Sequence, residues 1–380
     1  MNSNPASIRP VVSKADRKQF VDFAWEVYAN DPAWIPPLKD EVHGLLDPKK
    51  NPWFEHARAQ LWLAERGGKV VGRISAQVDE LVLEHMGAGT GQWGFLDAFD
   101  GGTAAALIDT AEEWLRAQGM TRALGPFALG VWDEPGLEIE GNDQPPTVMM
   151  GHHLPGYAAW IEAAGYAKAK DLVTYELDIT NWNDPLIERL IAAGERNPRI
   201  RIRTVDKSRF NEEARLILNI LNDAWSNNWG YIPLTEAEIA YAGKKLKPII
   251  YNELVRVAEY DGKPVAFMLT IPDINELTAD LNGELFPFNW IKLLWRLRKP
   301  RTRRLRVPLM GVAKELQGSR VASQLAFMMI ESTRRDAVTK FGATHGEFGW
   351  ILEDNKGMLS IAQLPGAHIN HRFRIYEKAL

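Results

Sequence analysis

The residues with the clearest chemical potential stand in the segment KELQGSRVA (314–322), between an apolar strand-like run and a long helical run. Small residues let a backbone come close to a ligand, and the first amides of a helix lack partners within the helix. Because the helix dipole is positive at that end, the segment predicts a loop that binds an anion such as a diphosphate. An ordinary helix start with Ser319 as its N-cap is the alternative.

An acid or a base is also needed if this loop serves a group-transfer reaction. The run ATHGEFGWIL (343–352) places His345 and Glu347 on one face, because side chains alternate along a strand. Such a pair could accept a proton directly or through water. Tyr231 is a candidate acid or substrate contact. The simpler alternatives are two polar residues on the solvent face of a strand and a loop tyrosine packed against Pro233.

Metal and nucleophile chemistry find little support in the sequence. The chain has no cysteine, which excludes disulfides, cysteine nucleophiles and thiolate metal sites. No HExxH motif, carboxylate facial set or Gly-x-Ser-x-Gly motif accompanies the remaining candidates. The candidate metal ligands left without such a motif are His152, His153, His368, His371, Glu138 and Glu140. We therefore expect no metal.

Composition limits the class and compartment of the protein. The 380 residues are enough for two domains, and 46% hydrophobic with 25% charged residues is typical of a globular chain. The start MNSNPASIRP has no apolar stretch that could serve as a signal peptide. No apolar run approaches the ~20 residues that cross a bilayer. We expect a cytoplasmic protein that can still lie peripherally on the inner membrane.

The segment 274–306 combines aromatic and apolar residues with cations. Between Lys292 and Arg306 there are eight Lys and Arg residues and no acid, although the net charge of the chain is −4. An amphipathic basic helix predicts contact with an anionic membrane surface from Phe286 to Arg306. One alternative is a core-packing helix whose cations line the entrance for an anionic ligand. Single-stranded nucleic acid is a third reading, but nothing else supports it, and we expect no nucleic acid partner.

Internal repeats divide the chain into two copies of one α+β unit. Three pairs of segments match in order at nearly constant offset, and we place the copies at 1–183 and 184–380. Each copy reads as strand, helices, hairpin, strand, long helix, strand, helix and final strand, with the long helices at 103–119 and 320–342. The matching pairs are 62–76 with 256–270, 34–38 with 231–235, and 172–179 with 373–380.

The loop segment VAKELQGSRVA resembles the acyl-CoA loop of the GNAT acyltransferase superfamily, Gln/Arg-x-x-Gly-x-Gly/Ala after a Val-bearing strand. Gln317 takes the Gln/Arg place, Arg320 replaces the first glycine and Ala322 takes the Gly/Ala place. The resemblance implies a tandem duplication of a GNAT-like mixed-sheet fold with acyl-CoA as co-substrate. It also implies an oxyanion donor among the amides of Gly311 and Val312. The residues expected at coenzyme A are Val312, Lys314, Gln317, Gly318, Ser319, Arg320, Val321, Ala322 and Asn355.

The first copy departs from that pattern. Its long helix follows Asp100-Gly101-Gly102 without a Gln or Arg, and an aspartate there would repel a diphosphate. We expect this copy to be degenerate, without acyl-CoA, and to build part of the acceptor pocket. In the second copy, the last helix lacks the tyrosine that often protonates the leaving thiolate in this superfamily.

The doubled layout and the apolar-basic insertion, with segments 125–166 and 225–235, resemble bacterial ceramide synthases. This resemblance implies an N-acyltransferase that joins a long-chain acyl thioester to a lipid-like amine, such as a sphingoid base. Two alternatives stay open: a non-catalytic acyl-CoA- or lipid-binding protein, and an acetyltransferase acting on a small amine.

Overall fold

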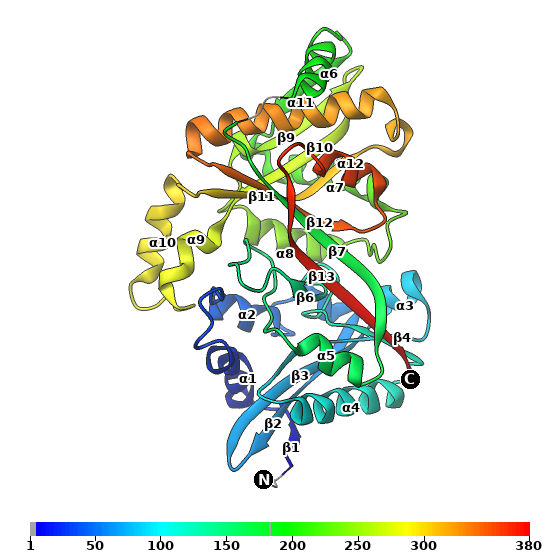
Figure 1. Ribbon diagram of the computed structural model, residues 1–380, viewed down its shortest axis with the longest axis vertical. Coiled ribbons are helices and arrows are strands. Elements are labelled where there is room, and N and C mark those ends of the chain that lie inside the picture. Colours follow the sequence, from blue (N-terminus) through cyan, green and yellow to red (C-terminus); the bar gives the residue numbers. More distant parts are fainter. Residues whose placement is uncertain (1–4, 182–183) are drawn as a thin grey trace. The chain divides into compact units, whose positions relative to one another are not determined.

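The computed structural model describes residues 5–181 and 184–380 (Figure 1). The chain forms two compact units. Unit 1 holds Met1–Leu172, Leu281–Leu285 and His371–Leu380, and unit 2 holds Val173–Asp280 and Phe286–Asn370. The expected boundary of the two sequence copies at 183/184 touches residues 182–183, which lie outside the described residues, and it stays a prediction.

Unit 1 is a mixed sheet with helices. Its strands follow the order β1-β2-β3-β4-β5-β13-β7, and β6 pairs with β13. The strands are β1 (Ser7–Pro10), β2 (Ala57–Arg66), β3 (Lys69–Asp79), β4 (Thr90–Ala98), β5 (Arg122–Gly125), β6 (Leu137–Glu140) and parts of β7 (Ala167–Asp178) and β13 (His368–Ala379). The helices are α1 (Lys14–Val27), α2 (Lys39–Leu45), α3 (Glu80–Met86), α4 (Gly101–Ala117) and α5 (Tyr157–Ala163).

The predicted hairpin and long helix of this half are confirmed. Gly67 and Gly68 have φ of 59° and 77°, the positive values that a tight two-residue hairpin turn needs. α4 begins after Asp100, whose side chain accepts from the amide of Thr103. Its apolar side packs on β3 and joins the buried core of unit 1, which includes Leu107 and Ile74.

Unit 2 repeats this plan, with the sheet order β7-β12-β11-β10-β9-β8. Its strands are β8 (Ile200–Thr204), β9 (Val255–Tyr260), β10 (Lys263–Pro272), β11 (Arg304–Val312) and β12 (His345–Leu352). Its helices are α6 (Pro185–Glu195), α7 (Phe210–Trp225), α8 (Glu236–Leu246), α9 (Ile274–Thr278), α10 (Asn289–Arg298), α11 (Arg320–Asp336) and α12 (Lys356–Ala362). The predicted helix over 320–342 is α11 followed by one π turn, which ends at Gly342 with φ of 72°.

Helices cover both faces of the sheet in unit 2. Because side chains alternate along β10, Ala266 and Met268 join the core beneath α11, while Phe267 faces the other way. On that second face, a Cβ at Gly311 would lie 3.1 Å from both Phe267 and Ala224 of α7. α7 and α11 therefore enclose β10 and β11 from opposite sides.

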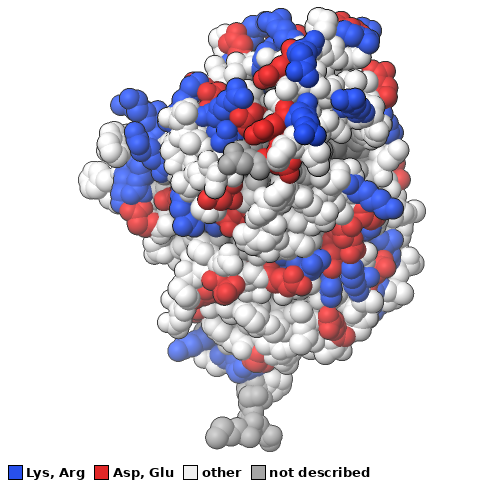
Figure 2. All heavy atoms as spheres, turned by 45° about the horizontal axis from the view of Figure 1, so that its top comes forward, with Lys and Arg blue, Asp and Glu red and all other residues white. Residues whose placement is uncertain are grey.

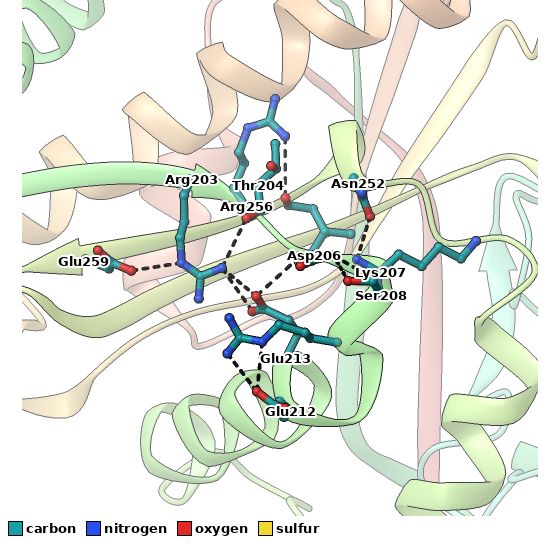
Figure 3. Close-up of polar contacts among 12 residues, drawn as sticks. Arg203, Thr204, Asp206, Lys207, Ser208, Glu212, Glu213, Asn252, Arg256 and Glu259 are labelled. Carbon is teal, nitrogen blue, oxygen red and sulfur yellow. Dashed lines mark hydrogen bonds and ion pairs between the residues drawn. The ribbon is translucent and has the colours of Figure 1, made fainter.

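Ion pairs hold the start of α7 to the sheet. Figure 3 shows Arg203 of β8 reaching Glu213 of α7 at 2.8 Å and Glu259 of β9 at 2.9 Å. Lys207 donates its amide to the side chain of Asn252 at 3.1 Å. These contacts fix the direction of α7. Its other end reaches the loop 314–319 that precedes α11.

Candidate active site

The start of α11 presents amides without partners. The Ser319 side chain caps the helix by accepting from the amide of Ala322 at 3.1 Å. The amides of Gly318, Arg320 and Val321 find no hydrogen-bond acceptor among the described residues. Gly318 has φ of 73°, which favours glycine. Several open amides at the positive end of a 17-residue helix suit a diphosphate.

Two of the predicted ligands hold the loop with their side chains. Gln317 donates from Nε2 to the carbonyls of Val312 at 2.9 Å and Ala224 at 3.2 Å. Lys314 donates from its amide to Asp223 at 2.7 Å and from Nζ to Asn227 at 3.0 Å. Both residues therefore tie the loop to the end of α7. Arg320 is exposed, and no described residue pairs with its guanidinium.

β11 separates from β12 just before this loop. The two strands pair in parallel from Arg304 with His345 to Val307 with Phe348, and β11 then continues beside β10 alone. The amide of Ala313 donates to Val265, so the neighbouring residue Val312 has its own amide and carbonyl directed away from β10. The amide of Val312 thus lies on the strand edge that β12 has left, where an extended ligand could pair.

The end of α7 and the following loop close on the same edge. The indole of Trp225 donates to the carbonyl of Met310 at 3.0 Å, and its ring lies 6.4 Å from that of Tyr231. The Tyr231 hydroxyl donates to Asn222, and burial raises the pKa of this tyrosine to about 12. The structure therefore brings Tyr231, β11 and the loop together. Sequence reasoning missed Trp225, although the row of aromatic residues there was a signal.

The two candidate general bases, His345 and Glu347, both lie on β12 but differ in burial. Glu347 is fully buried, and Asn370 donates to its carboxylate at 2.6 Å. His345 is half-buried, with Nδ1 2.8 Å from the hydroxyl of Thr344. Burial lowers the pKa of the neighbouring Arg306 to about 10, and the charge of Glu347 acts in the opposite direction. Asn355 lies apart from this pair, as the N-cap of α12, accepting from Met358 at 3.1 Å.

The corresponding place in unit 1 is filled by the chain itself. β4 pairs in parallel with β5 only over Thr90–Gln92. Beyond that point the amide of Phe127 donates to the carbonyl of Trp93 at 2.8 Å. Gln77 donates to the carbonyls of Phe127 and Leu129 at 3.1 and 3.0 Å. We call residues 126–129 the plug.

α10 exposes an apolar surface next to cations. Lys292 and Arg296 pair with Asp280, and these bonds hold the pKa of the Asp280 carboxyl well below its usual range. Figure 2 shows Lys and Arg side chains gathered on the edge that carries α9 and α10 in Figure 1. The exposed large apolar side chains of this segment are Phe286, Phe288, Trp290, Ile291, Leu294 and Trp295.

Membrane-spanning helices and metal-binding groups are both absent from the described residues. None of the described helices is both long enough and apolar enough to span a bilayer. No group of three or more His, Asp or Glu in the described part of the chain is arranged to hold a metal ion.

Comparison with solved structures identifies the fold. No protein-family model matches the chain. A tandem GNAT protein from the clavulanic acid biosynthesis pathway superposes with a TM-score of 0.57 at 16% identity, covering 98% of both chains. A GCN5-related N-acetyltransferase from Sphaerobacter thermophilus gives a TM-score of 0.52 at 14% identity. The match covers 98% of this chain and 95% of the acetyltransferase chain. The α+β mixed-sheet architecture is therefore that of a tandem GNAT protein.

Two curated relatives match along nearly the full length. Protein YghO of Escherichia coli (strain K12) is 42% identical, covering 100% of this chain and 97% of its own. The bacterial ceramide synthase of Caulobacter vibrioides (strain NA1000 / CB15N) is 43% identical, covering 98% of this chain and 97% of its own. The chain therefore belongs to the tandem GNAT-fold family that includes Protein YghO and this bacterial ceramide synthase.

Proposed function

We propose that this protein is an acyl-CoA-dependent N-acyltransferase that transfers a long-chain acyl group to the amine of a sphingoid base. The observation that carries the proposal is the row of open amides at the start of α11, beside the strand edge that β12 leaves. The full-length likeness to a bacterial ceramide synthase supports the choice of acceptor.

The geometry of unit 2 suggests how acyl-CoA would bind. The amides of Gly318, Arg320 and Val321 would hold the diphosphate, and the Arg320 guanidinium would add a charged donor. Pantetheine would lie along the open edge of β11, with the amide of Val312 directed at the thioester oxygen as charge develops there. Asn355 and its helix are the remaining expected contact in unit 2.

Proton transfer is assigned to Tyr231 beside that edge and to two residues of β12 in the part that still pairs with β11. Tyr231 carries its proton at neutral pH, as an ordinary tyrosine does, and it could protonate the departing thiolate. His345 and Glu347 are the candidate bases on β12. Asn370 donates to the carboxylate of Glu347 at 2.6 Å, and Arg306 lies opposite Glu347 on β11.

We further propose that only unit 2 binds acyl-CoA and that unit 1 serves the acceptor. The carboxylate of Asp100 caps the start of α4 and pairs with Arg66 at 3.0 Å, so a negative charge lies where a diphosphate would bind. The plug fills the place beside β4. These observations support a degenerate first copy.

α10 is proposed as the contact with an anionic membrane, because a long-chain acceptor lies in a bilayer. Trp295 is 73% exposed and Phe288 is 74% exposed, which is unusual for aromatic side chains without a partner surface. The neighbouring cations suit anionic headgroups. Replacing Trp290 and Trp295 by Ser should abolish sedimentation with phosphatidylglycerol vesicles. The idea fails if the wild-type protein does not sediment.

The enzyme assignment is tested by mixing purified protein with palmitoyl-CoA and a sphingoid base. We expect an N-acyl product by mass spectrometry and release of coenzyme A thiol. The thiol assay is clean because the chain has no cysteine. Acetyl-CoA preferred over palmitoyl-CoA would favour an acetyltransferase, and binding without turnover would favour a lipid-binding protein.

A further inference from the structure

Side chains of unit 2 already occupy two carbonyls on the edge of β11 that β12 leaves. Met310 and Val312 alternate with residues that bond to β10, so both direct their amides and carbonyls to the other side. The carbonyl of Met310 accepts from the indole of Trp225 at 3.0 Å. The carbonyl of Val312 accepts from Nε2 of Gln317 at 2.9 Å.

This edge therefore differs from an ordinary strand edge. An open strand normally presents donors and acceptors in alternation and can pair with either. Here pairing with β12 ends at Val307, and the amides of Met310 and Val312 have no acceptor on that side among the described residues. Because both carbonyls are occupied, the edge offers only N–H donors. It suits a ligand that presents carbonyl oxygens.

A donor-only edge matters for a thioester, because the oxygen of a thioester gains negative charge in the transition state of acyl transfer. Along the edge, the amide of Val312 lies between the carbonyl of Met310 and its own carbonyl. A carbonyl oxygen directed at the thioester oxygen would repel the developing charge. The bonds from Trp225 and Gln317 hold both carbonyl oxygens on protein donors instead.

The backbone of α7 fixes the position of Trp225. The preceding residue, Ala224, is 9% exposed and packs on β11, where a Cβ at Gly311 would lie 3.1 Å from the Cβ of Ala224. On its other side, the Trp225 ring meets the ring of Tyr231 edge-on, with 6.4 Å between the ring centres. The indole N–H is therefore held at the strand edge from two directions.

Other residues of the same helical turn hold the loop rather than the edge. Asp223 accepts from the amide of Lys314 at 2.7 Å, and the carbonyl of Ala224 accepts from Gln317 at 3.2 Å. These bonds set the path of the loop that follows β11. The bond from Trp225 acts further back, on the strand beside which the thioester would lie.

We propose that Trp225 is a positioning residue for the thioester. Its indole N–H holds the carbonyl of Met310, so that only amide donors face the oxygen on which charge develops. Trp225 acts through Met310, and no proton passes through the indole. This inference rests on the proposed N-acyltransferase function and adds a residue outside the loop to it.

The test removes the N–H of this indole and keeps its shape. Replacing Trp225 by β-(3-benzothienyl)alanine through amber suppression puts sulfur in place of the N–H. We expect kcat with palmitoyl-CoA and a sphingoid base to fall about tenfold, which is less than the ~100-fold cost of losing an oxyanion donor itself. The Kd for palmitoyl-CoA should change by no more than about twofold, because the amides at the diphosphate are untouched.

Two ordinary substitutions accompany this variant. Trp225→Phe also removes the N–H, and it should lower kcat in the same direction. Trp114→Phe is the matched control, because Trp114 is a half-buried tryptophan like Trp225 but lies on α4 of unit 1. Its kcat should equal that of wild type.

Infrared spectroscopy of palmitoyl-CoA labelled with ¹³C at the thioester carbonyl reads the edge directly. Hydrogen bonds from amide donors lower the stretching frequency of a carbonyl, so the wild-type complex should show a band below that of free palmitoyl-CoA. In the benzothienylalanine variant the band should move back towards the free frequency. In Trp114→Phe it should stay at the wild-type position.

The outcomes separate this inference from the proposed function. A lower kcat with the wild-type band would make Trp225 a merely structural residue and overturn the inference. Wild-type kcat and an unmoved band in the benzothienylalanine variant would also overturn it, and the proposed function would stay intact. A wild-type protein that neither shifts the thioester band nor turns over would overturn both.

Discussion

At the scale of single residues, Arg320 is the side chain that departs most from the GNAT loop pattern, and it is free to meet a phosphate. We expect Arg320→Glu to weaken palmitoyl-CoA binding at least about tenfold, because it removes a charge-assisted donor and adds a repelling carboxylate. Isothermal titration measures this. Lys244→Glu is the control, since Lys244 is an exposed cation on α8. Equal affinities for both variants would mean that the anion binds elsewhere.

His152 makes the stability of unit 1 depend on pH. Burial would lower its pKa, but the bonds to the carboxylates of Glu138 and Asp31 raise it above 6.5 in the folded state. Its contribution to the free energy of unfolding is therefore complete below the unfolded pKa. That contribution is lost as pH rises through the raised folded value. We therefore expect the free energy of unfolding of wild type to fall from pH 6.5 upward, and that of His152→Gln to fall less. Urea unfolding at several pH values checks this, and parallel curves would contradict it.

At the scale of elements, the plug is the structural reason to expect one acyl-CoA per chain. Gly94 has no room for a side chain, because a Cβ there would lie 1.7 Å from the carbonyl oxygen of Phe127. Gly94→Ala should lower the free energy of unfolding by about 1–3 kcal/mol or more. Gly357→Ala in α12 should not, because its Cβ would meet its nearest neighbour at an ordinary 3.6 Å. Titration of wild type should give a stoichiometry of one, and a value of two would refute a blocked first copy.

The sequence predicted those parts of the fold that depend on neighbouring residues. Both hairpins and both long helices follow local periodicity and turn chemistry, and the structure confirms them. Ser319 caps α11, as the alternative interpretation of that segment expects. The plug could not be predicted, because it depends on bonds from Gln77 to residues about fifty positions away. The pairing of Glu138 with His371 joins residues 233 positions apart, and nothing in either segment indicates it. The sequence predicts Gln317 as a ligand of coenzyme A, and this stays a prediction. The structure shows its side chain bonded to the carbonyls of Ala224 and Val312, which shapes the loop.

At the scale of the whole molecule, the chain completes unit 1 with its last ten residues. Tyr376 of β13 pairs with Gly125 of β5, and Phe373, Ile375 and Tyr376 are at most 1% exposed. The same strand supplies His371, whose Nδ1 lies 2.7 Å from a carboxylate oxygen of the buried Glu138. Unit 1 is therefore assembled from segments far apart in the sequence, and its stability depends on residues of β13.

This arrangement predicts that a change near the C-terminus weakens elements near the N-terminus. Phe373→Ala should destabilise unit 1 by about 3–5 kcal/mol, because it removes a buried aromatic ring and leaves a cavity. Hydrogen exchange should then lose protection in β4 and β5, while β10 and α11 of unit 2 keep theirs. Phe341→Ala, buried in the core of unit 2, should give the opposite pattern. Loss of protection in both units with either variant would show that they unfold as one cooperative body.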